Sequence, residues 1–394
     1  MKNIVLFREN IRTKIVTRFP NLGEWIYLSA FALYLLAMAL KGTMLVNFLI
    51  TERGIFYLSA VPALFVMGKI LFLDDYDWKE LVIYLLLETL LFAVGTNANE
   101  YMIFYLLFFI VGAKGINVDR ILQVYLIVNL SVIALAFIFS SSGFVKNVTV
   151  TRTDSPAVRF ALGAVYPTDL ASRVFFMMIA YAALKRFSFS LAEYCSYVAL
   201  TALTYIVTDT RIDLMLMVLL LLCIALYRPI EKLLNHLSAW MLTAISTFYV
   251  FLIIIMGYLY SPHIGILEKI NHFLSGRLFY ERLAFTNYNV TPFGQFIYQN
   301  GFGGGFKVVD YFYIDASYVR TLMMHGVLVF MLMLILFYLL FARFKTEKLN
   351  YWIICLALVL LTSGIDQHLW DISYNFIFLA LMATLVPIKT KKAK

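Results

Sequence analysis

The chain has 394 residues, of which 62% are hydrophobic and 14% charged, with a formal net charge of +9. Soluble globular proteins average about 45–50% apolar and about 25% charged residues, so the composition excludes an ordinary soluble enzyme and a disordered chain. Apolar runs of roughly 15–25 residues recur along the whole sequence, and a helix that crosses a bilayer needs about 20. The ten-residue alternating segments of a membrane barrel are absent from the sequence. The sequence therefore predicts an all-α polytopic membrane protein.

The first predicted element is a basic segment, 1–20, which mixes Lys and Arg with apolar residues and is expected to lie on the anionic inner leaflet. About 12 transmembrane helices follow, and the whole chain, 1–394, is expected to form a single transmembrane domain. The third, fourth and eleventh spans are short. The predicted spans are 25–41, 54–73, 81–96, 101–114, 121–143, 171–187, 191–208, 212–228, 239–260, 317–343, 350–364 and 370–387.

The positive charge is distributed unevenly between the two sides that these spans define. With the N-terminus inside, the inner segments carry nineteen Lys and Arg residues and the outer segments ten. Cytoplasmic loops of membrane proteins carry the excess of Lys and Arg, so both termini are expected in the cytoplasm. The charge therefore reports topology and does not indicate nucleic-acid binding. The two long connections, 144–170 and 261–316, are then extracytoplasmic, the second between the ninth and tenth helices.

Several polar residues fall within or beside predicted spans, where each needs an explanation. Glu88 and Asn129 lie in mid-span, and bonding between helices is the preferred interpretation over a proton relay, since no further carboxylates occur at matching depth. Asp74-Asp75-Tyr76-Asp77 contains an Asp-x-Asp pattern, but a solvated cytoplasmic loop is the better interpretation. The three cysteines lie inside apolar runs, and no disulfide is expected.

The sharpest polar cluster is the turn 208–213, Thr-Asp-Thr-Arg-Ile-Asp, between the seventh and eighth spans. Two apolar runs meet there with almost no loop, so Arg211 is expected close to the outer membrane face in a cavity lined by protein. A turn in which Asp209 and Asp213 neutralise Arg211, with no chemistry, remains the alternative.

The long outer loop, 261–316, combines an amphipathic segment with aromatic residues and glycines. Apolar residues at helical spacing predict an amphipathic helix over 266–285 on the outer leaflet, and it carries Arg277 and Arg282. Phe302 and Phe306 flank three consecutive glycines, and flat aromatic faces suit sugar rings and isoprenyl chains. The stretch 288–313 is expected to be a mobile lid, with a loop that rests on lipid as the alternative. No P-loop is predicted, because no Gly-Lys-Ser/Thr follows.

The loop ends in Asp315-Ala-Ser317-Tyr318-Val-Arg320 as the tenth span begins. Asp315 or Ser317 is a natural N-cap for that helix, which is a purely structural interpretation. The same helix start presents N–H groups to an anion. Arginine binds phosphate through a planar, permanently charged fork. An outer-face diphosphate site is therefore predicted from Arg211, Arg277, Arg282 and Arg320.

These features together resemble the Wzy-type polysaccharide polymerase family, which is related to the O-antigen ligases. The features are about a dozen spans, an Arg turn before the eighth, a Ser-Gly-Arg amphipathic outer loop, and Asp-x-Ser-Tyr-x-x-x-Leu-x-x-x-Gly over 315–326. The resemblance covers the whole chain in architecture and some thirty residues in motif. The ligases have a histidine where this chain has Asp315, which favours a polymerase and leaves the base open.

The resemblance implies a glycosyltransferase of the bacterial cytoplasmic membrane that joins undecaprenyl-diphosphate-linked oligosaccharide units on the outer face. Asp315 is the first choice of general base and His368, in the last outer loop, the second, although an exposed polar turn explains His368 as well. Tyr318, Phe302 and Phe306 are expected to contact sugar or lipid. Neither a metal nor a cofactor is predicted. The partners implied are the lipid-linked oligosaccharide, membrane lipids, a chain-length regulator and a flippase, without nucleic acid.

Two other functions compete with this one. A flippase for lipid-linked oligosaccharide also needs arginines for a diphosphate, but transporters commonly show two related halves, and the sequence has no internal repeat. A ligase that transfers finished polymer to another acceptor is the second rival. The sugars, the linkage formed and the anomeric outcome do not follow from the sequence.

Overall fold

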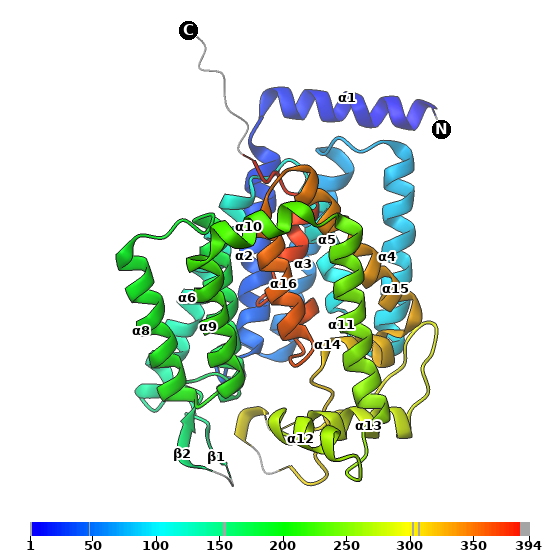
Figure 1. Cartoon of the computed structure of the whole chain (residues 1–394). Coiled ribbons are helices and arrows are strands. Elements are labelled where there is room, and N and C mark those ends of the chain that lie inside the picture. Colours follow the sequence, from blue (N-terminus) through cyan, green and yellow to red (C-terminus); the bar gives the residue numbers. More distant parts are fainter. Residues whose placement is uncertain (1, 47, 153–154, 302, 306–307, 387–394) are drawn as a thin grey trace.

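The computed structural model describes residues 2–46, 48–152, 155–301, 303–305 and 308–386. Within these ranges the protein is mostly helical, with long helices packed side by side into one bundle (Figure 1). The helices are α1 (Lys2–Arg18), α2 (Leu22–Lys41), α3 (Glu52–Phe72), α4 (Trp78–Ala98), α5 (Met102–Gly112), α6 (Val118–Ser141), α7 (Pro167–Leu184), α8 (Leu191–Thr208), α9 (Arg211–Ala225), α10 (Tyr227–His236), α11 (Ala239–Leu259), α12 (Gly265–Phe273), α13 (Arg277–Asn287), α14 (Ser317–Arg320), α15 (Gly326–Thr346) and α16 (Asn350–Ser363).

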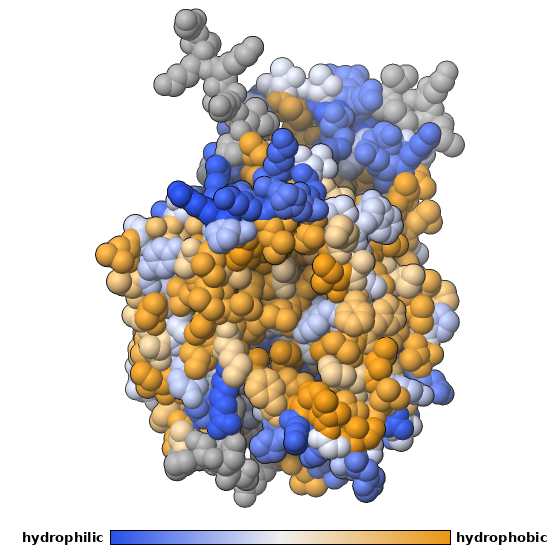
Figure 2. Space-filling view, in the orientation of Figure 1, coloured by the Kyte–Doolittle hydropathy of each residue, from blue (hydrophilic) through white to orange (hydrophobic). Residues whose placement is uncertain are grey.

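Seven helices of the described chain are long and apolar enough to cross a membrane, and an eighth is added if α9 and α10, bent by 83°, form one span. Figure 2 shows apolar residues around the middle of the bundle and polar residues toward its two ends. This is the surface that a bilayer requires, because lipid solvates apolar side chains and leaves backbone groups to be satisfied inside each helix. The protein is therefore a multi-pass membrane protein.

The two ends of the bundle differ in what covers them (Figure 1). One end, which we call the α1 face, carries α1, the α3–α4 turn and α10. The other end, the loop face, carries α12, α13 and a hairpin of two antiparallel strands, β1 (Thr149–Arg152) and β2 (Ser155–Phe160). The hairpin holds the two strands of the described chain and departs from the all-α prediction.

The α1 face is fixed by buried charges rather than by a solvated loop. Lys69 is 2% exposed and lies 2.6 Å from Asp74, which is 9% exposed. The same ammonium donates to the carbonyl of Gly112 at 2.7 Å. Arg8 of α1 donates to one carbonyl in the last turn of α3 and to two carbonyls of the α3–α4 turn. The expectation that Asp74 belongs to a solvated loop is therefore wrong, because Lys69 draws it into the bundle.

The last predicted span, 370–387, does not form a long helix. Its described part is irregular. It begins at the end of one short 3-10 turn, His368–Trp370, contains a second, Ile377–Leu381, and runs through the core to a bridge between Thr384 and Asn117. Arg343 of α15 donates to three of its carbonyls. Irregular backbone is tolerated at membrane depth only where protein buries it and satisfies its polar groups. The segment is apolar because it lies in the protein core.

Other predicted elements need smaller corrections. The amphipathic helix over 266–285 is two helices, α12 and α13, because Ser275 and Gly276 take left-handed φ values of 59° and 88°. The fourth predicted span, α5, has 11 residues, of which seven are buried and the other four partly buried. The tenth predicted span begins with one turn of α-helix, α14, continues in a π-helical turn, Thr321–His325, and resumes as α15 at Gly326.

Candidate functional site

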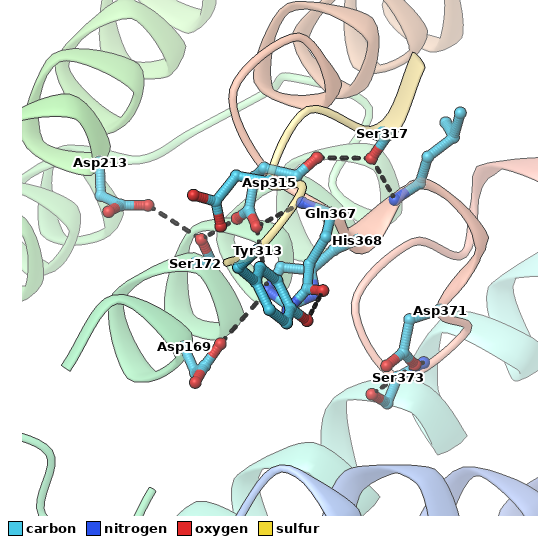
Figure 3. A network of polar contacts seen from close by, with 12 residues as sticks. Asp169, Ser172, Asp213, Tyr313, Asp315, Ser317, Gln367, His368, Asp371 and Ser373 are labelled. Atoms are coloured by element: carbon cyan, nitrogen blue, oxygen red, sulfur yellow. Dashed lines mark hydrogen bonds and ion pairs between the residues drawn. The ribbon is translucent and has the colours of Figure 1, made fainter. Parts of the chain in front are cut away.

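Four chain segments meet at the loop face and bring their acidic and basic side chains together (Figure 3). They are the first turn of α7, the start of α9, the residues before α14, and the turn after α16. We call this group the Asp–His cluster; it comprises Asp169, Ser172, Asp213, Asp315, Asp366 and His368. Ser172 lies at its centre, where its hydroxyl is 3.1 Å from Asp213 and also within hydrogen-bond distance of Asp366.

His368 lies between two carboxylates. Its Nε2 is 3.2 Å from Asp366 Oδ1 and 3.6 Å from Asp169 Oδ1, and the ring is 7% exposed. Burial by itself lowers the pKa of the imidazole, but the nearby carboxylates, Asp366 first, outweigh burial and raise the pKa. The ring also stacks on Tyr374, with centroids 3.5 Å apart. The imidazole is therefore fixed in plane and favoured as a cation, which makes it less available as a base than an ordinary histidine.

Asp315 precedes α14 and faces Arg277 of α13, with 3.5 Å between Oδ2 and Nε. Burial raises the pKa of Asp315, Arg277 opposes this, and the charges of Asp366 and Asp169 add to the rise. The Arg277 Nε is buried and makes no hydrogen bond within the described chain, while Nη1 donates to the carbonyl of Leu274. The structure therefore brings together, in one ion pair, two residues that the sequence singles out.

The N-cap interpretation of Asp315 and Ser317 is wrong. The N-cap of α14 is Ala316, and no side chain caps the helix. The Ser317 hydroxyl instead donates to the carbonyl of Asp366 and accepts from the N–H of Leu369 at 3.2 Å. Ser317 thus ties α14 to the turn that carries Asp366 and His368.

The sequence predicts that Arg320 binds diphosphate, but in the structure its guanidinium is engaged inside the protein. It is 12% exposed, and Nη2 lies 2.9 Å from Oε2 of Glu100, which is 14% exposed. Its Nη1 donates to Gln299 at 2.9 Å. The π-helical turn that follows places His325 4.0 Å from the same carboxylate. Arg320 holds the α4–α5 turn against α14.

Arg211 and Arg282, two of the other predicted arginines, are both exposed. Arg211 is the first residue of α9 and is exposed, after a turn in which Asp209 adopts a left-handed φ of 44°. Asp213 points into the bundle, where its carboxylate meets Ser172. Arg282 is exposed, donates to the carbonyl of Tyr258 and lies over that ring. In the described chain no hydrogen bond or ion pair joins Arg282 to the Asp–His cluster.

Of the three residues predicted to contact sugar or lipid, the structure describes only Tyr318. Tyr318 is fully buried and its hydroxyl donates to the carbonyl of Leu360, so it is a core residue at this position. Phe302 and Phe306 lie outside the described residues. The base of the predicted lid is bonded to the π-helical turn, where the N–H of Gln295 donates to the carbonyl of Met324.

The two polar residues predicted in mid-span differ in whether they form a hydrogen bond between helices. Asn129 of α6 accepts a 2.8 Å hydrogen bond from Arg173 of α7, which is the interhelical contact expected of it. The carboxylate oxygens of Glu88 are buried and have no hydrogen-bond partner in the described chain. The interhelical interpretation therefore holds for Asn129 alone.

Sequence reasoning missed Asp169 and Ser172 and gave Asp213 no role beyond the turn. A signal was present in the segment 167–173, Pro-Thr-Asp-Leu-Ala-Ser-Arg, where proline opens a helix and polar residues one turn apart enter an otherwise apolar run. Asp169 and Ser172 lie three residues apart and share one face of α7. Both side chains of that face contact the turn after α16.

Comparisons with protein-family models, with curated proteins and with solved structures give no match. What the site can do is therefore indicated by its own chemistry. Carboxylates suit the hydroxyl donors of a sugar, whereas the fork of an arginine suits phosphate. Among the described residues, no three or more His, Cys, Asp or Glu side chains are arranged to hold a metal.

Proposed function

We propose that the protein is a polysaccharide polymerase that joins undecaprenyl-diphosphate-linked oligosaccharide units on the outer face of a bacterial cytoplasmic membrane. The observation that carries the proposal is the pairing of Asp315 with Arg277 at the edge of a buried acidic cluster that contains His368. The helices α12 and α13 border this cluster at the loop face, which is where the headgroup of a lipid-linked substrate would lie.

The proposed orientation puts the loop face outside and the α1 face inside the cell. The excess of Lys and Arg on the segments of the α1 face supports it. In this topology twelve segments cross the membrane, eleven as helices and the last as the irregular chain buried behind α15 and α16. Both termini are then cytoplasmic, and the loop 261–316 is extracytoplasmic.

The proposed reaction is a displacement at an anomeric carbon. A hydroxyl of one lipid-linked unit attacks that carbon in the growing chain, the new glycosidic C–O bond forms, and the C–O bond to undecaprenyl diphosphate breaks. Asp315 accepts the proton of the attacking hydroxyl, and its raised pKa makes it a better base than an ordinary aspartate. Arg277, with Arg211 at the membrane edge, stabilises the negative charge of the leaving diphosphate. The carboxylates of Asp169 and Asp366 accept hydrogen bonds from sugar hydroxyls.

His368 is the alternative base, and a single-turnover experiment separates the two candidates. Purified Asp315→Asn should bind the donor and fail to transfer, because asparagine keeps the shape of aspartate and takes no proton. His368→Ala should join units slowly. Near-normal joining by Asp315→Asn together with an inactive His368→Ala assigns the base to His368.

The lipid-linked material of a deletion strain tests the function itself. Loss of a polymerase leaves single repeat units on the outer leaflet. Single units confined to the inner leaflet indicate a flippase, and long lipid-linked chains indicate a ligase; either result overturns the proposal.

A further inference from the structure

Glu281 is a buried carboxyl group beside the proposed site that no contact of the described chain explains. It lies on α13, is 2% exposed, and its Oε2 has no hydrogen-bond partner. The side chain packs so closely against α11 at Gly257 that a Cβ added to this glycine would clash with Oε2. Burying an ionised carboxylate without a partner is very costly, so such groups normally pair or become neutral.

Arg277 is the natural partner for Glu281 and yet does not pair with it. The two residues are four apart on α13, the spacing at which side chains of opposite charge meet on a helix. The guanidinium instead turns to Asp315, 3.5 Å away, and no ion pair with Glu281 forms within 4 Å. A charged Glu281 would compete with Asp315 for this arginine, whereas a neutral one would not.

We propose that Glu281 is a positioning residue that works as a neutral acid: by staying protonated it leaves Arg277 to Asp315 and to the diphosphate of the substrate. Its ionisation then draws Arg277 away and stops joining. This inference rests on the proposed function. The groups that face Glu281 are Arg277 on its own helix, Asp315 before α14 and Tyr249 on α11.

The electrostatic surroundings agree with this geometry. Burial raises the pKa of Glu281 well above its ordinary value, the nearby Asp315 raises it further, and Arg277 opposes the rise. The hydroxyl of Tyr249 uses its one hydrogen to donate to the carbonyl of Leu361 at 2.9 Å, so it cannot also donate to an ionised Glu281.

The test is the pH profile of single-turnover joining of lipid-linked units by purified protein. The wild-type rate should fall by about tenfold per pH unit on the alkaline side, once Glu281 ionises. The joining rate of Glu281→Gln should match the wild-type rate at neutral pH and should not fall as the pH rises. The joining rate of Glu281→Met, which introduces no hydrogen-bond donor, should also not fall at alkaline pH. Glu268→Gln is the matched control. Glu268 lies on α12 and accepts a hydrogen bond from the hydroxyl of Tyr260, and the joining rate of this variant should still fall at alkaline pH.

Two results of the pH profile would overturn the inference. One is an alkaline fall that persists in Glu281→Gln and Glu281→Met. The other is loss of joining at neutral pH in both variants while the protein stays folded in the membrane.

A second readout separates this inference from the function. The infrared carbonyl band of a protonated carboxylic acid should be present in wild-type protein at neutral pH and diminished in Glu281→Gln, whether or not the protein joins sugars. A wild-type protein that shows the band and joins nothing contradicts the polymerase proposal alone. Absence of the band difference contradicts the role of Glu281 alone.

Discussion

The ion pair between Glu100 and Arg320 gives the sharpest prediction about stability, since the sequence alone predicts a substrate role for Arg320. Both side chains are mostly buried, and their nearest charged atoms are 2.9 Å apart. Replacing Glu100 by Gln keeps a hydrogen-bond acceptor but leaves the guanidinium without a counter-charge. Breaking a buried ion pair in this way costs about 3–5 kcal/mol of unfolding free energy. Glu100→Gln should therefore unfold at a clearly lower temperature in detergent.

The double variant Glu100→Gln/Arg320→Met is the matched control, because removing both charges leaves none unpaired. It should recover most of the lost stability, since buried pairs replaced by apolar groups are often close to neutral in free energy. The assay is thermal unfolding of purified protein, followed by joining activity of the folded fraction. If Glu100→Gln is as stable as wild type and Arg320→Met is folded but inactive, Arg320 acts on the substrate and the structural role is wrong.

The pH dependence of this pair has a definite sign. Burial alone would raise the pKa of Glu100, but Arg320 and His325 outweigh burial and lower it. A carboxyl group with a lowered pKa contributes stability that is present above its ordinary pKa and is lost as the pH falls through its folded value. Wild-type protein should therefore lose stability in acid more steeply than Glu100→Gln does.

The remaining predictions concern the site and the loop beside it. Arg277→Ala should abolish polymer while the protein stays in the membrane, and Arg277→Lys should rescue poorly because the planar fork is lost; wild-type polymer length in Arg277→Ala contradicts this role. Asp366→Asn should lower the pKa of His368, measured by NMR titration of the imidazole, and an unchanged pKa would show that the Asp366 charge is not what raises it. Gly294→Ala should destabilise the base of the loop by roughly 1–2 kcal/mol or more, because φ is +78° and the new Cβ would clash with a backbone carbonyl. Gly303→Ala, where the added Cβ meets open space, is its control in thermal unfolding, and equal losses in both variants would contradict the steric argument.

Much of the fold follows from hydropathy because lipid-facing helices must be long and apolar. The same reasoning fails for the predicted helix over 370–387, because the described part of this apolar run, 370–386, is irregular chain in the protein core. Hydropathy measures exclusion from water and does not distinguish burial in lipid from burial in protein. The break at Ser275 and Gly276 is also missed, since two short helices keep the apolar spacing of one.

The site can be predicted from the sequence only in part. Asp315 and His368 stand out because each is a polar residue next to a predicted span, and Arg277 stands out because it lies on the amphipathic segment of the outer loop. Ser172 does not, because its role depends on how α7 packs against the turn after α16, a contact between residues 194 positions apart. Arg320 has a partner that the sequence does not reveal, because its guanidinium pairs with a glutamate 220 positions away.

The central claim is tested most directly with purified protein in vesicles that carry undecaprenyl-diphosphate-linked repeat units on the leaflet beside the loop face. We expect products of two or more units, with one undecaprenyl diphosphate released for each linkage formed, and no joining by Asp315→Asn. Single units that cross to the other leaflet without being joined would contradict the claim.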